Sequence, residues 1–284
     1  MGVNTGKLLI VDGSNLLFQM FYGMPSRIIG AHGKPVQGTL GFVGALLKII
    51  RMTRPTHVIA VFDGECQNER KDIDPDYKAN RPDYSEMPEE EVPFSQLPDI
   101  YAALAFLGLQ YVETTVCETD DIIAAYTLTY KQDTEIVISS FDSDFFQLVD
   151  DGVSVLRYRG DNTVICDGEY GKERYGVEPC RYADYKAFVG DTADNIRGVR
   201  GVGPKTAAAL IRDFGSALEI LEKVEQISKP SVRLAVTESR DRVRMNLDLV
   251  TLGCKAEIPI SMEKLAYTDG GYTTGDVLRA IGVK

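Results

Sequence analysis

The sequence predicts an α/β fold, in which a mainly parallel central sheet carries helices on both faces and is followed by a helical region. Up to about residue 170, short apolar strands alternate with helical apolar patterns, which is typical of βαβ crossovers. Beyond Tyr170 the pattern is helical throughout. The chain has 284 residues, of which 44% are hydrophobic, so it can form one large domain or a domain with a smaller companion.

Each strand and helix is predicted from its apolar spacing and its flanking residues. Four strands are expected, at Lys7–Val11, His57–Phe62, Leu109–Val112 and Glu135–Ser139. Helices are expected in the first region at Leu16–Tyr22, Leu40–Arg51 and Asp99–Leu107, and in the second at Tyr182–Val189, Pro204–Phe214, Ala217–Lys223 and Val232–Asp248. The chain is therefore expected to divide into residues 1–170 and residues 171–284.

An irregular insertion, at about residues 70–98, follows the second strand. Prolines interrupt any long regular element in it, at Pro75, Pro82, Pro88, Pro93 and Pro98. Its basic residues come first, at Arg70, Lys71, Lys78 and Arg81, and its acidic residues follow, at Glu86, Glu89, Glu90 and Glu91. Long irregular loops in compact domains are usually functional or disordered, so this insertion is a candidate functional segment.

Acidic residues follow three of the predicted strands: Asp12 the first, Asp63 the second, and Asp142 the last. In an open parallel sheet, ligands bind beyond the carboxyl ends of the strands, so these carboxylates are expected to face one crevice. With two later acidic groups, the candidate metal ligands are Asp12, Asp63, Glu118, Asp120, Asp121, Asp142, Asp144, Asp191 and Asp194. So many carboxylates stay ionised together only beside cations. This predicts two or more Mg²⁺ or Mn²⁺ ions and metal-assisted phosphate chemistry.

Taken singly, each of these acids could instead form a turn or a helix cap. A shared site is favoured because the strand ends and the following helix starts are acidic together. An ideal helix places Glu118 and Asp121 about 60° apart but turns Asp120 away from them. The three can therefore share a site only if this stretch is a loop-to-helix junction.

Composition restricts the chemistry further. The formal net charge is −11, but nine of the 42 acidic residues are the candidate ligands, so the rest of the chain, with 31 basic residues, is nearly neutral. Global acidity therefore does not exclude a nucleic-acid partner. The two histidines, His32 and His57, cannot build a histidine-rich zinc site. The absence of a signal segment, of a membrane-spanning apolar run and of C-x-x-C spacing favours a cytoplasmic protein with reduced thiols. The cysteines are Cys66, Cys117, Cys166, Cys180 and Cys254.

The basic part of the insertion is a candidate substrate contact. Arg70, Lys78 and Arg81 could grip phosphates near a scissile bond. Tyr77 and Tyr84 could stack on an unpaired base. The alternative interpretation is a solvated charged loop.

A glycine-rich turn, Gly198–Ala207, opens one of the late helices. Glycines such as Gly201 and Gly203 let a backbone approach phosphate closely, and a helix N-terminus offers free N–H donors. Lys205 adds a cation, and Thr206 follows it. Such a hairpin can hold a nucleic-acid duplex without reading its sequence, although a plain helix-packing corner would look similar. It is neither a Walker loop nor a dinucleotide fingerprint, because the spacing differs and no strand precedes it.

Together these motifs resemble the 5′-nuclease (flap endonuclease) family, most closely the 5′→3′ exonuclease domain of bacterial DNA polymerase I. The resemblance runs from about Leu8 to about Leu252. It rests on Val11–Gly13, Val61–Asp63, Tyr77–Arg81, Glu118–Asp121, Asp142–Asp144, Gly190–Asn195 and Gly201–Ala207. Order and spacing both fit. No proofreading or polymerase region follows, so either a free-standing nuclease or an excised domain is expected.

The resemblance implies a PIN-like fold with a helical arch at the insertion and a helix–three-turn–helix motif at about residues 182–214. It implies that all nine acids bind Mg²⁺ or Mn²⁺, that Lys78, Arg81 and Asp120 are catalytic, and that a K⁺ ion can accompany the hairpin. The expected substrate is DNA with a 5′ flap, nick or 5′ end, or RNA-primed DNA. A monomer acting beside a separate DNA polymerase is expected.

Three rival functions stay open. An aspartyl phosphatase using Asp12 would need a second aspartate two residues later, where Ser14 stands. A PIN-type ribonuclease would lack the arch and the hairpin. A non-catalytic branched-DNA-binding protein would have lost some of the acids.

Overall fold

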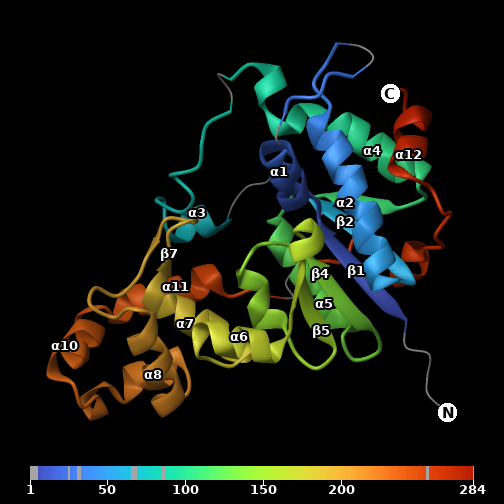
Figure 1. The fold of residues 1–284 in the computed structure, drawn as a ribbon. Helices are drawn as coiled ribbons and strands as arrows, with labels where there is room; N and C mark the ends of the chain where they lie inside the picture. Colours follow the sequence, from blue (N-terminus) through green and yellow to red (C-terminus); the bar gives the residue numbers. More distant parts are fainter. Residues whose placement is uncertain are drawn as a thin grey trace, which may run out of the picture.

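The computed structural model describes residues 6–24, 26–30, 33–64, 69–84, 87–253 and 256–283. Its centre is a six-stranded sheet with the order β3-β2-β1-β4-β5-β6, in which only β6 runs antiparallel to its neighbour (Figure 1). The strands are β1 (Lys7–Asp12), β2 (His57–Phe62), β3 (Gln110–Glu113), β4 (Glu135–Ser139), β5 (Val153–Arg157) and β6 (Val164–Cys166). The predicted mainly parallel sheet is confirmed, with two further strands that the sequence analysis did not predict.

The three central strands end at the same level. Val11 of β1 pairs with Ala60 of β2 and with Ser139 of β4, so the residues that follow each strand emerge side by side. Parallel strands can end together in this way because each helical crossover returns the chain to the end of the sheet at which the strands begin. The register therefore brings Asp12, Asp63 and the start of the 140–144 loop together, as predicted.

Twelve α-helices are present in the described residues. They are α1 (Gly13–Gly23), α2 (Gln37–Thr53), α3 (Glu69–Ile73), α4 (Leu97–Phe106), α5 (Thr119–Tyr130), α6 (Gly168–Tyr175), α7 (Tyr182–Val189), α8 (Pro204–Phe214), α9 (Ala217–Glu222), α10 (Pro230–Glu238), α11 (Arg240–Val250) and α12 (Thr274–Ala280). The prediction of one helix over 232–248 is wrong. The chain leaves the helical conformation at Ser239 (φ −107°, ψ 15°), and the next residue, Arg240, bonds the Leu221 carbonyl at 2.6 Å, a tertiary contact that the local pattern does not show.

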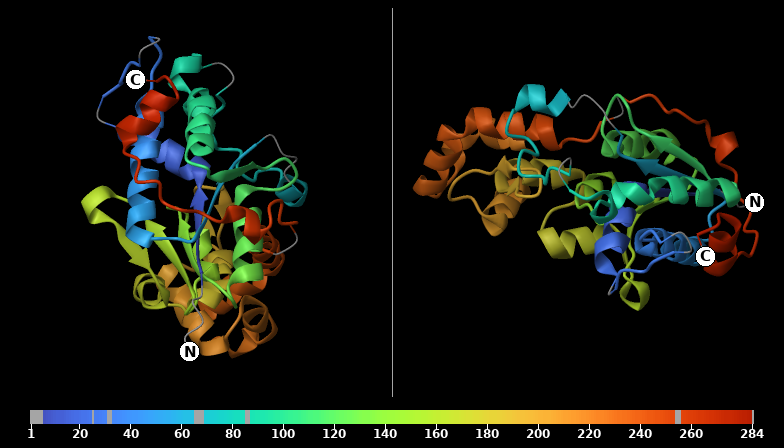
Figure 2. Two further views of the ribbon diagram at one scale, coloured as in Figure 1. Left: turned by 90° about the vertical axis from the view of Figure 1, so that its right-hand side faces the viewer. Right: turned by 90° about the horizontal axis from the view of Figure 1, so that it is seen from above.

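Two apolar cores sandwich the sheet. Side chains alternate along β1, so Leu8 and Ile10 join one core while Leu9 and Val11 join the other. The second core is completed by α1, α2 and α4, whereas the first is completed by α5 and by the late helices α7 to α11. Helices α7 to α11 thus share a core with one face of the sheet, whereas Val277 of α12 joins the core on the other face. The views agree that α8 and α10 lie at the opposite end of the molecule from α2 and α12 (Figures 1 and 2).

The insertion contains little α-helix. In its described residues, 69–84 and 87–96, α3 is followed by turns, extended chain and the 3₁₀ helices Glu89–Glu91 and Pro93–Gln96. The helical arch that the resemblance implies is thus represented by short helical pieces, because the prolines prevent a longer helix. The far end of the insertion is fixed by Gln96, whose buried Oε1 accepts hydrogen bonds from Thr39 N at 2.8 Å and Thr39 Oγ1 at 3.2 Å.

The predicted glycine-rich turn is present before α8. Gly201 has φ 85°, a left-handed conformation that side-chain-bearing residues rarely adopt. Gly203 caps α8, Pro204 is its first residue, and Lys205 lies exposed in the first turn. In the described ranges, no helix is both long enough and apolar enough to cross a bilayer.

Candidate metal centre

Asp12 is held at the junction of β1 and α1. Its Oδ1 accepts a hydrogen bond from Asn15 N at 3.0 Å, and its Oδ2 accepts one from Ser140 Oγ at 2.7 Å. Burial raises the pKa of Asp12 to about 7, with further contributions from the charges of Asp63 and Asp142. The helix cap that was an alternative explanation is real, but it engages only one oxygen. The contributions of Asp63 and Asp142 to the raised pKa indicate that Asp12 also belongs to an acidic site.

Asp63 and Asp120 lie on the same side of the sheet. Asp63 Oδ1 accepts a hydrogen bond from Thr119 Oγ1 at 2.6 Å, which ties the end of β2 to the start of α5. Burial raises the pKa of Asp120 well above its usual value, and the nearby charges of Asp142 and Asp12 raise it further. Asp12, Asp63, Asp120 and Asp142 therefore form one group of mutually repelling carboxylates, called the first acid group below.

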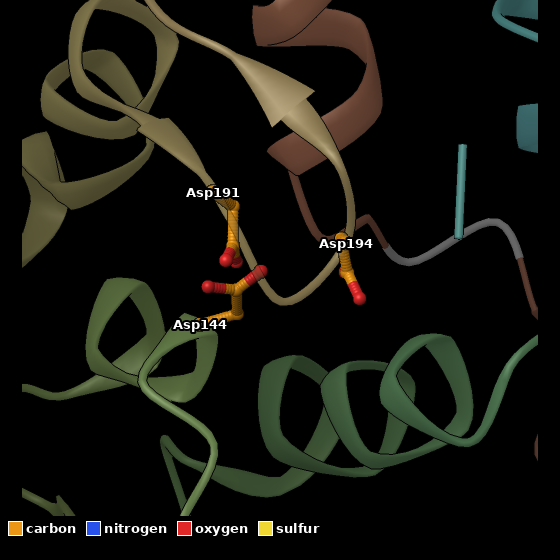
Figure 3. A group of neighbouring side chains, drawn as sticks. All are labelled: Asp144, Asp191 and Asp194. Carbon is orange, nitrogen blue, oxygen red and sulfur yellow. The ribbon is translucent and has the colours of Figure 1, made fainter. Parts of the chain in front are cut away.

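A second acid group consists of Asp144, Asp191 and Asp194. Each offers a carboxylate oxygen within 4.8 Å of the others, and it is the one such set of acids, histidines or cysteines found in the described residues (Figure 3). Asp144 starts a 3₁₀ helix, whereas Asp191 ends the two-residue strand β7 (Gly190–Asp191), which pairs with β8 (Ile196–Arg197). Lys186 of α7 donates hydrogen bonds to both Asp144 and Asp191.

Asp142 links the two groups. After burial itself, the charge of Asp142 is among the causes that raise the pKa values of Asp12, Asp120, Asp144 and Asp194. Burial raises the pKa of Asp144 to about 7 even though Lys186 opposes the shift. The two groups are therefore neighbours within one acidic centre, which is the convergence that the sequence predicted.

Glu118 is surrounded by cations. It precedes α5 in extended conformation, so this stretch is a loop-to-helix junction, which was the condition for a shared site. Its carboxylate accepts hydrogen bonds from Lys78 Nζ at 2.6 Å, Arg70 Nη1 at 2.6 Å and the Tyr77 hydroxyl at 3.0 Å. Although burial raises the pKa of Glu118, Lys78 and Arg70 outweigh it, so the pKa lies below its usual value.

The structure corrects the predicted roles of Arg70, Tyr77 and Asp121. The Arg70 side chain is only 12% exposed and is engaged by Glu118, by both oxygens of Asp121 and by the Leu249 carbonyl. It therefore joins the insertion to α5 and α11, and both Asp121 oxygens accept its hydrogen bonds. The Tyr77 ring is 3% exposed in a small core, so it cannot stack on a base.

The other predicted contacts from the insertion are Arg81 and Tyr84. Arg81 is half exposed and donates to Asp194 Oδ1 at 3.1 Å, so it remains available to a ligand. Tyr84 packs edge-to-face on Phe18 and Phe94, with ring centroids 6.0 and 5.7 Å away. His57 lies at the start of β2, which agrees with the predicted surface or strand-edge position. His32 lies outside the described residues.

The donor set fits hard divalent cations. In both groups the ligand atoms are carboxylate oxygens, which suit Mg²⁺ or Mn²⁺ rather than zinc. Burial, with a smaller contribution from neighbouring acids, raises the pKa values of Asp12 and Asp144 to about 7, so added positive charge would favour their ionised forms. Metal ions would supply that charge.

These buried acids make the stability of the metal-free protein depend on pH. Asp12 and Asp144 ionise at the ordinary pKa of 3.8 when unfolded but at a pKa of about 7 when folded. Between these values the folded protein binds more protons than the unfolded chain, so the free energy of unfolding falls as the pH rises. We expect a higher melting temperature in EDTA at pH 5 than at pH 8, by calorimetry.

Added Mg²⁺ should restore more stability at pH 8 than at pH 5, because ionised carboxylates bind it better. Glu118 and Asp191, whose pKa values are lowered, lose their stabilising charge only at more acidic pH. A melting temperature in EDTA that climbs from pH 5 to pH 8 would contradict this account.

Comparison with known proteins agrees with this arrangement. A family model described as 5′-3′ exonuclease, N-terminal resolvase-like domain, matches residues 7–176, and one described as 5′-3′ exonuclease, C-terminal SAM fold, matches residues 177–271. The chain belongs to the 5′-3′ exonuclease family. A 5′-3′ exonuclease of Aquifex aeolicus is 32% identical over 260 residues, which cover 91% of this chain and 86% of that protein.

Longer relatives also contain this region. DNA polymerase I of Rhizobium leguminosarum is 33% identical over 264 residues, which cover 90% of this chain but 25% of the polymerase. This family member therefore spans about a quarter of that relative's length. The predicted resemblance to the exonuclease region of bacterial DNA polymerase I is confirmed.

Two solved structures share the fold. The T5 D15 protein, co-crystallised with metal ions, is 26% identical, with a TM-score of 0.71 over 86% of this chain and 88% of that one. The catalytic core of Rad2 in complex with DNA is 15% identical, with a TM-score of 0.61 over 97% of this chain and 93% of that one. The Rad2 likeness supports the fold alone.

Lys186 was missed by the sequence analysis. Only 5% of its side chain is exposed, and Asp144 and Asp191 raise its pKa against the effect of burial. One indication of its role is visible in the sequence: Lys186 is the single lysine in the mainly apolar stretch 182–189, five residues before Asp191. Thr119 and Ser140 were also missed, because short hydroxyl residues reveal their partners only after folding.

Proposed function

We propose that the protein is a Mg²⁺- or Mn²⁺-dependent, structure-selective 5′ nuclease that hydrolyses DNA phosphodiester bonds near 5′ ends. One observation carries the proposal: two carboxylate groups, linked by Asp142, meet beneath a basic segment. Membership of the 5′-3′ exonuclease family supports the same reaction class. Primer removal and repair are the processes that need such an activity.

The residues of the chain divide the work between metal binding and substrate binding. Asp12, Asp63, Asp120 and Asp142 would hold one ion, and the second acid group another. When bound, divalent ions activate water and stabilise the leaving oxygen of a phosphodiester. Lys78 and Arg81, now paired with Glu118 and Asp194, would turn to the phosphate of the substrate, since charge-assisted bonds to phosphate can replace those to carboxylates.

The hairpin before α8 would hold the duplex next to the cut. Its exposed helix N-terminus and Lys205 offer phosphate contacts without base-reading groups, so selectivity would come from duplex shape and a free 5′ end. A related protein, the T5 D15 flap endonuclease, 25% identical, has been solved with DNA and metal ions. A K⁺ ion at the hairpin belongs to the same proposal.

Lys205→Ala should weaken binding to duplex DNA and reduce its dependence on salt. One phosphate contact fewer lowers the slope of log K against log salt by about 1. Fluorescence anisotropy at several KCl concentrations, with Ca²⁺ in place of Mg²⁺, measures this slope. Lys223→Ala, an exposed lysine beyond α9, is the matched control. An unchanged slope in Lys205→Ala would remove the hairpin from the binding surface.

The activity itself is tested with a labelled 5′-flap substrate, first with Mg²⁺ and then with EDTA. We expect cleavage near the junction in Mg²⁺ and none in EDTA. Equal product in both conditions would reject the metal mechanism. Product lengths on flap, nicked and gapped duplexes and on single-stranded RNA would separate this function from a PIN-type ribonuclease. Tight flap binding without cleavage in Mg²⁺ or Mn²⁺ would favour a non-catalytic branched-DNA-binding protein.

Four further features of the proposal have the same basis. We propose that residues 1–170 form the nuclease part and residues 171–284 the duplex-binding part. We also propose that the protein acts as a monomer, in the cytoplasm, beside a DNA polymerase. Polymerase fusion in the longer relatives supports that last partner.

A further inference from the structure

The insertion is fastened to the loop that carries the second acid group. We call residues 74–81 the arch base and residues 191–195 the metal loop. Three hydrogen bonds to backbone carbonyls join them: Asn195 Nδ2 to Asp76 O at 2.7 Å, Lys78 N to Asp194 O at 3.0 Å, and Asn80 Nδ2 to Thr192 O at 2.9 Å. The bonded residues are more than 110 positions apart in sequence, so only the fold brings them together.

The backbone is strained on both sides of this contact. Among the described residues, three that are not glycine have positive φ, and two of them are Lys78 (56°) and Asn195 (59°). The left-handed conformation is unfavourable for most L-residues, and asparagine is among those that tolerate it best. Such strain persists where surrounding contacts fix the chain, and it is concentrated at functional sites. Asn195 therefore serves two purposes, because it tolerates the left-handed backbone conformation and its carboxamide donates a hydrogen bond to the Asp76 carbonyl.

The fastened segment carries two of the cations that contact the acidic centre. Two residues of the arch base reach the acids from this fixed backbone: Lys78 Nζ lies 2.6 Å from Glu118 Oε1, and Arg81 Nη2 lies 3.1 Å from Asp194 Oδ1. The lysine also sits at the strained position, whose amide bonds the metal loop. A shift of the metal loop would therefore move both cations relative to the acids.

We propose that Asn195 is a positioning residue that docks the arch base on the metal loop and so sets Lys78 and Arg81 against the acidic centre. This inference rests on the proposed nuclease function, since the cations matter there for the phosphate of the substrate. Asn195 acts through the Asp76 carbonyl, and the carbonyl of the neighbouring Asp194 accepts the Lys78 amide. Asn80 supports the same contact from the opposite side.

Three variants test the docking, with Asn162→Ala, an exposed asparagine in the 160–162 turn, as control. Asn195→Gly keeps the left-handed turn but removes the carboxamide. Asn195→Ala removes the carboxamide and opposes the turn, and Asn80→Ala removes the second fastening. Each is assayed for kcat and KM on the flap substrate, and for amide hydrogen exchange of residues 76–81 in the metal-free protein.

Asn195→Gly should lower kcat about tenfold, the effect of one lost hydrogen bond, while KM changes much less. Amide exchange at Lys78 should become faster. Asn195→Ala should show both effects more strongly than Asn195→Gly, and Asn80→Ala should show them more weakly. The control should match the wild type in both measurements.

Wild-type kcat and wild-type exchange at Lys78 in Asn195→Gly would overturn the inference, as would a lower melting temperature with unchanged kcat. The outcome is separable from that of the proposed function. If the wild-type protein cleaves no 5′-ended substrate in Mg²⁺, the nuclease proposal fails, yet the exchange at Lys78 still decides whether Asn195 docks the arch base.

Discussion

Asp12→Asn should abolish cleavage and at the same time make the metal-free protein harder to unfold at pH 8. Asparagine keeps the cap on α1 but cannot supply the anionic ligand, and losing such a metal ligand lowers kcat by about 10³-fold or more. The ionised Asp12 destabilises the fold at pH 8, since burial raises its pKa to about 7. Its replacement should therefore raise the free energy of unfolding by about 2–4 kcal/mol.

Flap cleavage in Mg²⁺ and urea unfolding in EDTA measure the two effects. The control is Asp161→Asn, an exposed aspartate of the 160–162 turn, which should behave as the wild type in both assays. The stability gain should shrink as the pH is lowered to 4, because Asp12 is then protonated in the folded wild type. An active Asp12→Asn variant, or one less stable than the wild type at pH 8, would disprove the assignment.

Lys78→Met should lower kcat by about 10²-fold while leaving Mg²⁺ binding intact or stronger. Methionine preserves the length of the side chain and removes only the charge that pairs with Glu118 at 2.6 Å. Removing one positive group near a developing phosphate charge has effects of this size. The ion should bind at least as tightly, because a competing cation has left the carboxylate.

Single-turnover cleavage and Mg²⁺ titration by calorimetry separate the two effects. Lys71→Met removes a neighbouring charge at an exposed position of α3 and should change neither. If Lys78→Met cleaves normally, Lys78 serves only to neutralise Glu118 in the metal-free protein.

Local sequence patterns predicted the elements that place the acids. The bounds of β2, β4, α7 and α8 match the expectation, because apolar runs with clear glycine, proline or polar limits are strong local signals. The strand β6 was missed since it has three residues at the sheet edge, and β7 and β8 have only two each. Their pairing depends on tertiary contact rather than on propensity.

The acidic centre was predictable as a set of residues but not as a set of pairs. Convergence follows from parallel topology, which the βαβ pattern already implies. The choice of partner does not: Arg70 bonds Glu118 and Asp121, about 50 positions later, and Lys186 lies 42 positions from Asp144. A run of basic residues in a loop looks the same whether it faces substrate, solvent or a carboxylate. The buried ring of Tyr77 illustrates the same ambiguity.

The insertion is anchored at one end by the arch base and at the other by the buried amide of Gln96. Lengthening a chain between two fixed anchors costs only about 0.6 kcal/mol for each doubling of its length. The reach of this span can therefore change through insertions or deletions without displacing a single carboxylate. The size of substrate that the insertion admits can therefore be changed separately from the hydrolytic chemistry. A protein engineer could graft segments of other lengths between the arch base and Gln96.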